Sequence, residues 1–184
     1  MKEGNKNMSR LLTLSDEITE KSVKDIITSI QDWNLQDNEN DKKQKDFKRE
    51  PIHFMINSCG GSLYSSMGVA SMIKTSKTPI YTYCIGGALS GGFLMFIHGH
   101  KRFCYEGSNF LYHQMSFSGS YKTLNWHDND IKSSIEQEKR YEKMILDTTK
   151  ITAKQLKEYN EKNLDWWISP DEALELGIVD EIIK

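Results

Sequence analysis

The sequence has little cysteine, little proline and no long hydrophobic run. Its three cysteines, Cys59, Cys84 and Cys104, form no CxxC motif, so we expect a reducing compartment rather than a disulfide framework. No apolar run is long enough to cross a membrane, and the start, MKEGNKNMSRLL, lacks the apolar centre of a secretory signal. The sequence therefore predicts a cytoplasmic protein with no membrane partner.

An excess of charge of one sign is also lacking. The chain carries 24 Lys and Arg against 26 Asp and Glu, which gives a formal net charge of −2. Without a basic field, a nucleic-acid partner is not expected. The 184 residues are 38% hydrophobic and 27% charged, which is typical of a globular protein, and we expect a single domain over 1–184.

Strand-like and helix-like segments alternate along the chain. A short apolar strand, RLLTL, precedes a helix in which Val23, Ile26, Ile27 and Ile30 share one face. Residues 35–50 are polar and of mixed charge, which predicts a mobile surface loop. Further on, PIHFMINS, PIYTYCIGG, KRFCYE and NFLYHQ indicate strands, and LYSSMGVASMIKTS and SGGFLMFIHG indicate helices. This order predicts an α/β fold with a largely parallel sheet.

A long polar helix is expected at about 126–150. Its apolar stripe is thin and consists of Ile131, Ile135, Met144 and Ile145. Such a helix buries little surface against its own domain and gains most by packing on another copy of itself. The sequence therefore predicts a homo-oligomer.

The C-terminal helices have clear start and stop signals. Thr152 and Gln155 match a capping box. In SPDEALELG, Ser169 is the expected N-cap, Glu172 completes a second box and Gly177 is the stop. IVDEII then predicts a closing strand.

The segment CIGGALSGGFLMF raises the question of catalysis. It places Ser90 on a glycine-rich turn between a strand and a helix. There a serine is either a helix N-cap or a nucleophile, and a nucleophilic serine needs a base. His113 ends an apolar strand, where sites of open α/β sheets form, and Asp165 stands beside the aromatic WWIS, which would partly shield a carboxylate that orients a base. Taken singly, each is more often an ordinary structural residue.

Acyl transfer also needs backbone N–H groups that bind an oxyanion. Gly60 and Gly61 follow a strand, and Gly91 follows Ser90 at the start of a helix. Both places can direct an N–H into a cleft, although a glycine pair is equally an ordinary turn. From the residues alone, the prediction is an α/β domain with the groups of a serine hydrolase.

A metal site is the alternative chemistry. His98, His100 and Cys104 have the spacing H-x-H…C. No second ligand pair accompanies them, so we expect no metal.

Several blocks in order resemble a known family. INSCGGS, CIGGALSGGFLM, KRFCYEGSNFLYHQ and LDWWISPDEALELGIVDEII are similar to the blocks INSPGGS, CIGxAASMGAFLL, KRxxLPNSxxMIHQP and RDxFMSAxEAxxYGLID of the Clp protease proteolytic subunit, ClpP. The likeness covers about 51–183. It implies a ClpP/crotonase-like spiral of βαβ units with a protruding strand–helix handle at about 114–150.

The resemblance also implies roles for single residues. Ser90 falls on the family's nucleophile, His113 on its general base and Asp165 on its orienting acid. Gly61 and Gly91 fall on the two oxyanion-hole positions.

The resemblance implies that the substrate is an unfolded polypeptide, which the protein would cleave as a serine endopeptidase. It would add as a strand beside 61–63 and 116–118, which makes substrate contacts of Ser62, Leu63, Ser116 and Phe117.

The resemblance further implies two stacked seven-membered rings around a closed chamber, fed by an AAA+ ATPase. The subunit itself needs no cofactor, since ATP is used only by that partner. Few residues precede RLLTL, where the family has a longer arm that docks the ATPase, which argues against this docking. Cys59 and Met115 replace prolines of the family pattern, and Gly91 replaces a methionine.

Three other functions compete with this one. A crotonase-type acyl-CoA enzyme shares the fold and the backbone oxyanion hole. A non-catalytic ring subunit would modulate a host Clp complex, and a capsid-maturation type of protease would act without an ATPase.

Overall fold

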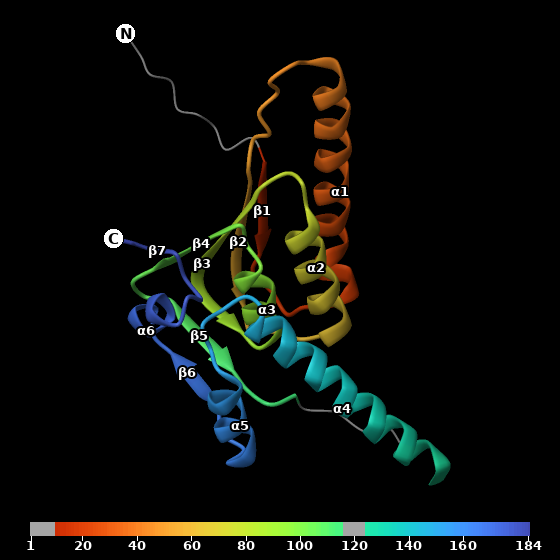
Figure 1. Cartoon of the computed structure of the whole chain (residues 1–184), viewed down its shortest axis with the longest axis vertical. Helices are drawn as coiled ribbons and strands as arrows, with labels where there is room; N and C mark the ends of the chain where they lie inside the picture. Colours follow the sequence, from red (N-terminus) through yellow and green to blue (C-terminus); the bar gives the residue numbers. More distant parts are fainter. Residues whose placement is uncertain (1–9, 116–123) are drawn as a thin grey trace.

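A central sheet with helices stacked beside it forms the body of the protein in this computed structural model, which describes residues 10–115 and 124–184 and, within 124–130, the backbone alone. The strands are β1 (Leu11–Leu14), β2 (Ile52–Ser58), β3 (Ile80–Leu89), β4 (Lys101–Tyr105), β5 (Asn109–Tyr112), β6 (Trp166–Ile168) and β7 (Glu181–Ile183). The helices are α1 (Glu20–Lys43), α2 (Leu63–Thr75), α3 (Gly91–Ile97), α4 (Leu124–Leu146), α5 (Ala153–Glu161) and α6 (Pro170–Glu175). Figure 1 shows α1 and α2 side by side along the sheet and α4 extending away from it.

The sheet is largely parallel, as the alternation of strands and helices predicts. Its order is β1-β2-β3-β4-β7, and all these pairs are parallel. The long strand β3 divides its partners: Tyr81–Cys84 pair with β4, whereas Gly87–Leu89 pair with β5. This division turns the second half of β3 out of the main sheet, so the chain winds as a spiral of βαβ units, and β3 ends at Ser90.

The core lies between the sheet and helices α1 to α3. On α1, Val23, Ile26 and Ile30 are buried, and Ile27 is half-buried against the core, which confirms the predicted face. All seven residues of α3 are buried. A helix with no exposed face is fixed in position, so the residue at its start is fixed as well.

The prediction of a loop at 35–50 is wrong for residues 35–43, because α1 continues to Lys43. This last part of α1 has no apolar face. A buried carboxylate, that of Asp37, anchors it to the rest of the protein instead. Asp37 is fully buried. It accepts two hydrogen bonds of 2.7 Å from Arg10 and one of 2.8 Å from Thr78. Because polar groups hold this turn of the helix, hydrophobic periodicity could not reveal it.

Asp37→Asn is expected to destabilise the protein by about 3–5 kcal/mol, because it leaves the Arg10 guanidinium without its partner in a largely buried place. Burial raises the pKa of Asp37, but the hydrogen bonds from Arg10 and Thr78 outweigh it and the pKa is lowered overall. The ion pair of Arg10 and Asp37 therefore contributes its full share to the free energy of unfolding above the unfolded-state pKa of about 4. This stabilisation is lost as pH falls through the folded-state pKa of Asp37.

Urea unfolding of the wild type and of Asp37→Asn at several pH values would measure this. The two stabilities should converge in acid. Glu39→Gln on the exposed face of the same helix is the control, and equal losses from the two variants would contradict the assignment.

The long polar helix is confirmed as α4, although it ends at Leu146 rather than residue 150. Its C-terminal half packs on the core through Tyr141 and Ile145, which are buried, whereas Ile131 and Ile135 are 57% and 47% exposed. Figure 1 shows α4 projecting beyond the sheet. Apolar residues that stay exposed on a projecting helix leave a face for another molecule. Residues 116–123 of the expected handle lie outside the described part.

The C-terminal part follows the predicted order with two differences. The capping box of Thr152 and Gln155 is present. At α6, Ser169 accepts from the Glu172 N–H, but the Glu172 carboxylate accepts a hydrogen bond from Trp166 Nε1 instead of completing the box. The second difference is β6, a short antiparallel strand that the sequence analysis did not predict.

Candidate active site

Ser90 occupies a sharp corner between β3 and α3. Its backbone has φ 53° and ψ −117°, a conformation that costs a non-glycine residue of the order of 1–3 kcal/mol and persists only where the surroundings impose it. The Ser90 N–H donates to the carbonyl of Leu111 on β5 at 2.9 Å, and the helix behind it is buried. The corner resembles the strand–turn–helix elbow that exposes a nucleophile.

The Ser90 hydroxyl does not cap α3. Ser90 stands at the N-cap position, yet its side chain makes no capping hydrogen bond. Of the two roles that the sequence leaves open for this serine, the side-chain N-cap is therefore absent. Among the described residues the hydroxyl has no hydrogen-bond partner, and Ser90 lines a cavity.

The glycine turn lies directly against this corner. Gly60 has φ 101°, and a Cβ there would lie 2.7 Å from the Cβ of Ser90. Gly61 has φ 143°, and a Cβ there would overlap the carbonyl oxygen of Ile18. Both positions therefore need glycine for their backbone angles and for the close approach.

The pairing with Ile18 decides where the Gly61 peptide groups point. The Ile18 N–H donates to the carbonyl of Gly60 and the Ser62 N–H donates to that of Ile18, both at 2.7 Å. In this parallel bridge between Ile18 and Gly61, the N–H and C=O of Gly61 point to the opposite side. That side is the cavity that Gly61 lines.

Gly91 provides the second N–H at the first position of α3. It has no partner within the helix, because the first turn of a helix leaves its N–H groups unpaired. A Cβ at Gly91 would overlap Oγ of Ser66 and lie 3.1 Å from its Cβ. The buried Ser66 therefore excludes a side chain at this position, where the family has methionine.

His113 follows β5 and lines the same cavity. Its Nδ1 lies 2.6 Å from the carbonyl oxygen of Gln114. A carbonyl only accepts, so Nδ1 carries the proton and Nε2 of the neutral ring is an acceptor. Among the described residues no hydrogen bond joins His113 to Ser90 or Asp165, so a backbone carbonyl sets the tautomer in this structure.

Asp165 lies immediately before β6, the strand that pairs with β5. The register joins Phe110 to Ile168 and Tyr112 to Trp166. One step further, the same register brings His113 opposite Asp165, a spacing at which side chains on one face meet. Asp165 is exposed, however, so the expectation that aromatic neighbours shield it is wrong.

The alternation of β6 explains this exposure. Trp166 turns inward and stacks on Tyr159, with ring centroids 4.6 Å apart, whereas Trp167 is 56% exposed. Neither ring covers the carboxylate. Asp165 is also not among the residues that line the cavity.

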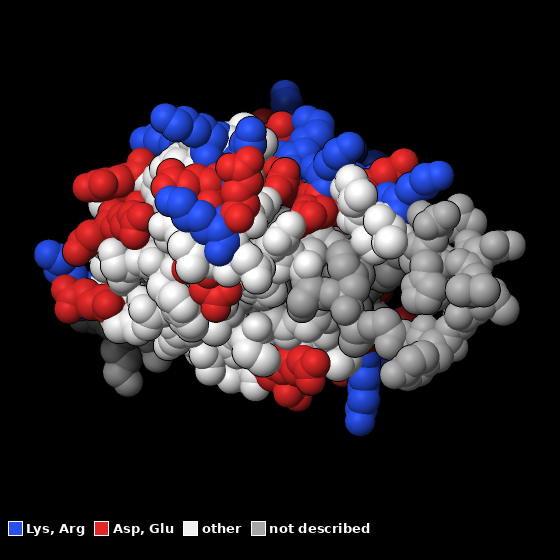
Figure 2. Space-filling model, turned by 90° about the horizontal axis from the view of Figure 1, so that it is seen from below, with Lys and Arg blue, Asp and Glu red and all other residues white. Residues whose placement is uncertain are grey.

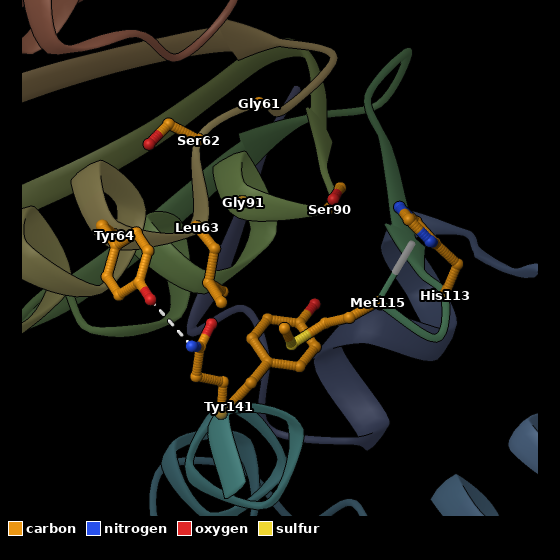
Figure 3. Close-up of a pocket in the computed structure, with 10 residues that line it drawn as sticks. Gly61, Ser62, Leu63, Tyr64, Ser90, Gly91, His113, Met115 and Tyr141 are labelled. Atoms are coloured by element: carbon orange, nitrogen blue, oxygen red, sulfur yellow. Dashed lines mark hydrogen bonds between the residues drawn. The ribbon is translucent and has the colours of Figure 1, made fainter. Parts of the chain in front are cut away.

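The cavity beside Ser90 has a volume of about 340 Å³. Six residues expected from the sequence line it: Gly61, Ser62, Leu63, Ser90, Gly91 and His113. Figure 3 shows Ser90 and His113 on one side of it and Tyr64 on the other, with Leu63, Met115 and Tyr141 between them. The expected substrate contacts Ser116 and Phe117 lie outside the described residues.

Four lining residues have no role in the sequence analysis: Tyr64, Met115, Gln137 and Tyr141. Gln137 Nε2 donates to the Tyr64 hydroxyl at 2.7 Å and so joins α4 to α2. Only Met115 carries a sequence signal, because it departs from the family's HQP motif. The other three come together when α4 crosses the end of α2.

Other candidate sites remain without support in the described part of the chain. All three cysteines are free thiols, as expected. Burial raises the pKa of the Cys104 thiol to about 12, which keeps it protonated. No group of three His, Cys, Asp or Glu among the described residues is placed to hold a metal ion.

Charges of both signs intermix on the end of the molecule where α4 and α5 lie. Figure 2 shows acidic and basic side chains along one edge of this face and a mostly uncharged middle. Acidic and basic side chains adjoin one another along this edge in the described part of the face.

The fold and the site define the class of protein: an α/β protein with the groups of a serine hydrolase. The serine stands on a buried corner, and the histidine, whose Nε2 is an acceptor, lines one cavity together with the glycine turn. The comparisons narrow this class. The Clp protease family matches over residues 5–184, so the chain belongs to the Clp protease family.

Two relatives carry the name "ATP-dependent Clp protease proteolytic subunit 1", from Chlamydia muridarum and Chlamydia trachomatis serovar D. Each is 28% identical over 179 residues, which cover 95% of this chain and 86% of the relative. Family and relatives support a peptidase activity.

A solved structure, "ClpP1 N165D mutant from Listeria monocytogenes", has the same fold. Its TM-score is 0.78 at 22% identity, over 95% of this chain and 91% of that one. The expected ClpP/crotonase-like fold is therefore confirmed. In the described residues, no helix is long and apolar enough to cross a membrane.

Proposed function

We propose that the protein is a serine endopeptidase that hydrolyses unfolded polypeptides through an acyl-enzyme on Ser90. One observation carries the proposal: the uncapped Ser90 hydroxyl, the ring of His113 and the glycines Gly61 and Gly91 all face one cavity. A nucleophile, a base and two backbone donors around one space are the requirements of acyl transfer.

The chemistry begins with His113. Its Nε2 takes the hydroxyl proton of Ser90 while Oγ attacks the peptide carbonyl carbon. The oxyanion that forms accepts hydrogen bonds from the N–H groups of Gly61 and Gly91. The imidazolium then gives its proton to the amide nitrogen, the C–N bond breaks and the amine leaves. Water, deprotonated by His113, attacks the ester and restores the serine.

Asp165 is proposed to orient the histidine in the productive complex. The Nδ1–H of His113 would exchange the carbonyl of Gln114 for the carboxylate across the β5–β6 pair. A carboxylate stabilises the imidazolium better than a carbonyl does, because it carries the opposite charge.

The assembly is proposed to be a homo-oligomer of two stacked heptameric rings, with polypeptide supplied by an AAA+ unfoldase. The exposed apolar residues Ile131 and Ile135 on α4 support contacts between copies. The two relatives named above are called ATP-dependent, which supports an ATPase partner. In this proposal the subunit holds no cofactor of its own.

Covalent labelling tests the chemistry. A fluorophosphonate probe should attach to Ser90, be located by peptide mass spectrometry, and fail to label Ser90→Ala or denatured protein. Native mass measured on the same sample gives the ring number. A crotonase-type enzyme or a non-catalytic ring subunit would leave Ser90 unlabelled, which would overturn the proposal.

A further inference from the structure

The hydroxyl of Tyr141 faces the cavity beside Ser90, where solvent can reach it. The residue is 3% exposed, and its ring stacks on Tyr112 with centroids 5.9 Å apart. Among the described residues the hydroxyl has no hydrogen-bond partner, and Figure 3 shows it directed into the cavity. A side chain that fills the cavity displaces water from this hydroxyl, and a hydroxyl that is then left buried without a partner costs free energy. The group therefore favours a ligand atom that replaces the hydrogen bond to water.

Two further polar groups stand at the far end of the cavity. Gln137 uses its Nε2 for Tyr64 and for Ser133, at 2.7 and 3.1 Å, so its Oε1 remains an acceptor. The Tyr64 hydroxyl accepts from Gln137 and keeps its own hydrogen to donate. The end of the cavity thus offers one acceptor and one donor, and Tyr141 adds a hydroxyl that can do either.

The walls between these groups are apolar. Leu63, Met115 and the ring of Tyr141 line the space between Ser90 and the polar end. Apart from His113, no titratable charge lines the cavity: of its described residues none is Lys, Arg, Asp or Glu. An acidic or basic side chain therefore finds no ion-pair partner here and loses hydration along the apolar walls, although the far end at Tyr64, which is 72% exposed, stays open to solvent.

The orphaned carboxylate oxygen Oε1 of Glu138 does not alter this conclusion. This oxygen lies on α4, the helix that carries Tyr141, and it is buried with no hydrogen-bond partner among the described residues. Burial raises the pKa of Tyr112 and of Glu142, and the nearby charge of Glu138 adds to both shifts. Glu138 therefore lies toward the side of α4 that meets β5 and α5. It is not among the residues that line the cavity.

We infer that this cavity receives the side chain of the residue on the amino side of the cleaved bond, the P1 residue, and that Tyr141 selects a glutamine there over an aliphatic side chain of equal length. The inference rests on the proposed function, because the cavity adjoins Ser90, Gly61 and Gly91, where the scissile carbonyl would lie. An amide both donates and accepts, as the polar groups require. A site with buried polar groups rejects an analogue that leaves them unpaired.

Burial gives Tyr141 a constant hydrogen-bonding capacity. Desolvation, with a smaller contribution from Tyr112, raises its pKa well above the usual value. The phenol therefore stays protonated at any pH at which the protein works. Its preference for an amide should not change with pH.

The test uses fluorogenic peptides that differ only at P1, with glutamine, norleucine, glutamate or lysine. For the wild type we expect kcat/KM for glutamine to exceed that for norleucine about tenfold, as one buried hydrogen bond allows, and to exceed those for glutamate and lysine. In Tyr141→Phe the ratio of glutamine to norleucine should fall about tenfold while the norleucine rate is retained. Tyr105→Phe, a tyrosine of β4 that does not line the cavity, should keep the wild-type ratio.

A structural role for the hydroxyl predicts a different outcome. Since it has no protein partner, Tyr141→Phe should keep the wild-type thermal midpoint. A lower midpoint with an unchanged ratio would overturn the inference. So would a wild type that prefers norleucine, glutamate or lysine.

The proposed function fails separately, if no peptide is cleaved at all. In that case binding of the glutamine and norleucine peptides to Ser90→Ala, measured by fluorescence polarisation, still decides the inference. Glutamine should bind more tightly, and the replacement Tyr141→Phe in the same background should abolish the difference. Equal affinities would overturn the inference independently of catalysis.

Discussion

Ser90→Ala should lower kcat for a fluorogenic peptide by roughly 10⁴- to 10⁶-fold, the range seen when a serine nucleophile is removed. The loss follows because no other group of the cavity can form the acyl-enzyme: Tyr141 is protonated and His113 acts as the base. Stability should change little or rise slightly. Ser90 holds a conformation with positive φ, and its hydroxyl makes no capping bond that alanine would lose.

Non-additivity provides the control for this experiment. His113→Ala alone should be nearly as damaging as Ser90→Ala, and the double variant should be no worse than either, since the two residues act as one unit. Native mass should be the same for all three. Additive losses, or turnover near that of the wild type in Ser90→Ala, would refute the assignment of the nucleophile.

Gly61→Ala should lower kcat/KM by about 10²- to 10³-fold, the cost of losing one oxyanion donor. A methyl group at this position overlaps the carbonyl oxygen of the buried Ile18. The turn must then move, and φ of 143° is itself strained for alanine. The Gly61 N–H therefore leaves its position beside Ser90 even if the protein stays folded.

Gly68→Ala is a matched control for this substitution. Gly68 lies in the middle of α2, and a Cβ there would meet nothing within 4 Å. Alanine in a helix interior is favoured over glycine by about 0.5–1 kcal/mol, so this variant should be slightly more stable and fully active. A folded Gly61→Ala with the kcat/KM of Gly68→Ala would exclude Gly61 from the oxyanion site.

Much of the site could be predicted because each part has a local cause. The glycine-rich turn, the serine at the strand–helix junction and the histidine at a strand end are adjacent to their own elements in the sequence. The parallel order of strands then brings the ends of β3 and β5 together, and the Ser90 to Leu111 hydrogen bond joins them. Asp165 was named for the aromatic residues beside it, which do not shield it, and its position opposite His113 depends on β6, a strand that was not predicted.

The rest depends on contacts between distant segments. The helix at 35–43 is held by Arg10 and Thr78, and its buried face is polar, so its periodicity resembles that of a loop. The tyrosines of the cavity have no motif, because Tyr64 and Tyr141 lie 77 positions apart in the sequence. Their meeting requires α4 to cross the end of α2, which no pattern of single elements specifies.

The short strand β6 determines how precisely Asp165 is aligned with His113. Side chains on a strand alternate between faces, so a slip of one residue against β5 would turn every side chain over. Such a slip would put the buried Trp166 in water and the exposed Trp167 in the core, which strongly disfavours it. The two tryptophans therefore fix the alignment of this three-residue strand, and with it the position of Asp165 opposite His113, although neither tryptophan takes part in the chemistry.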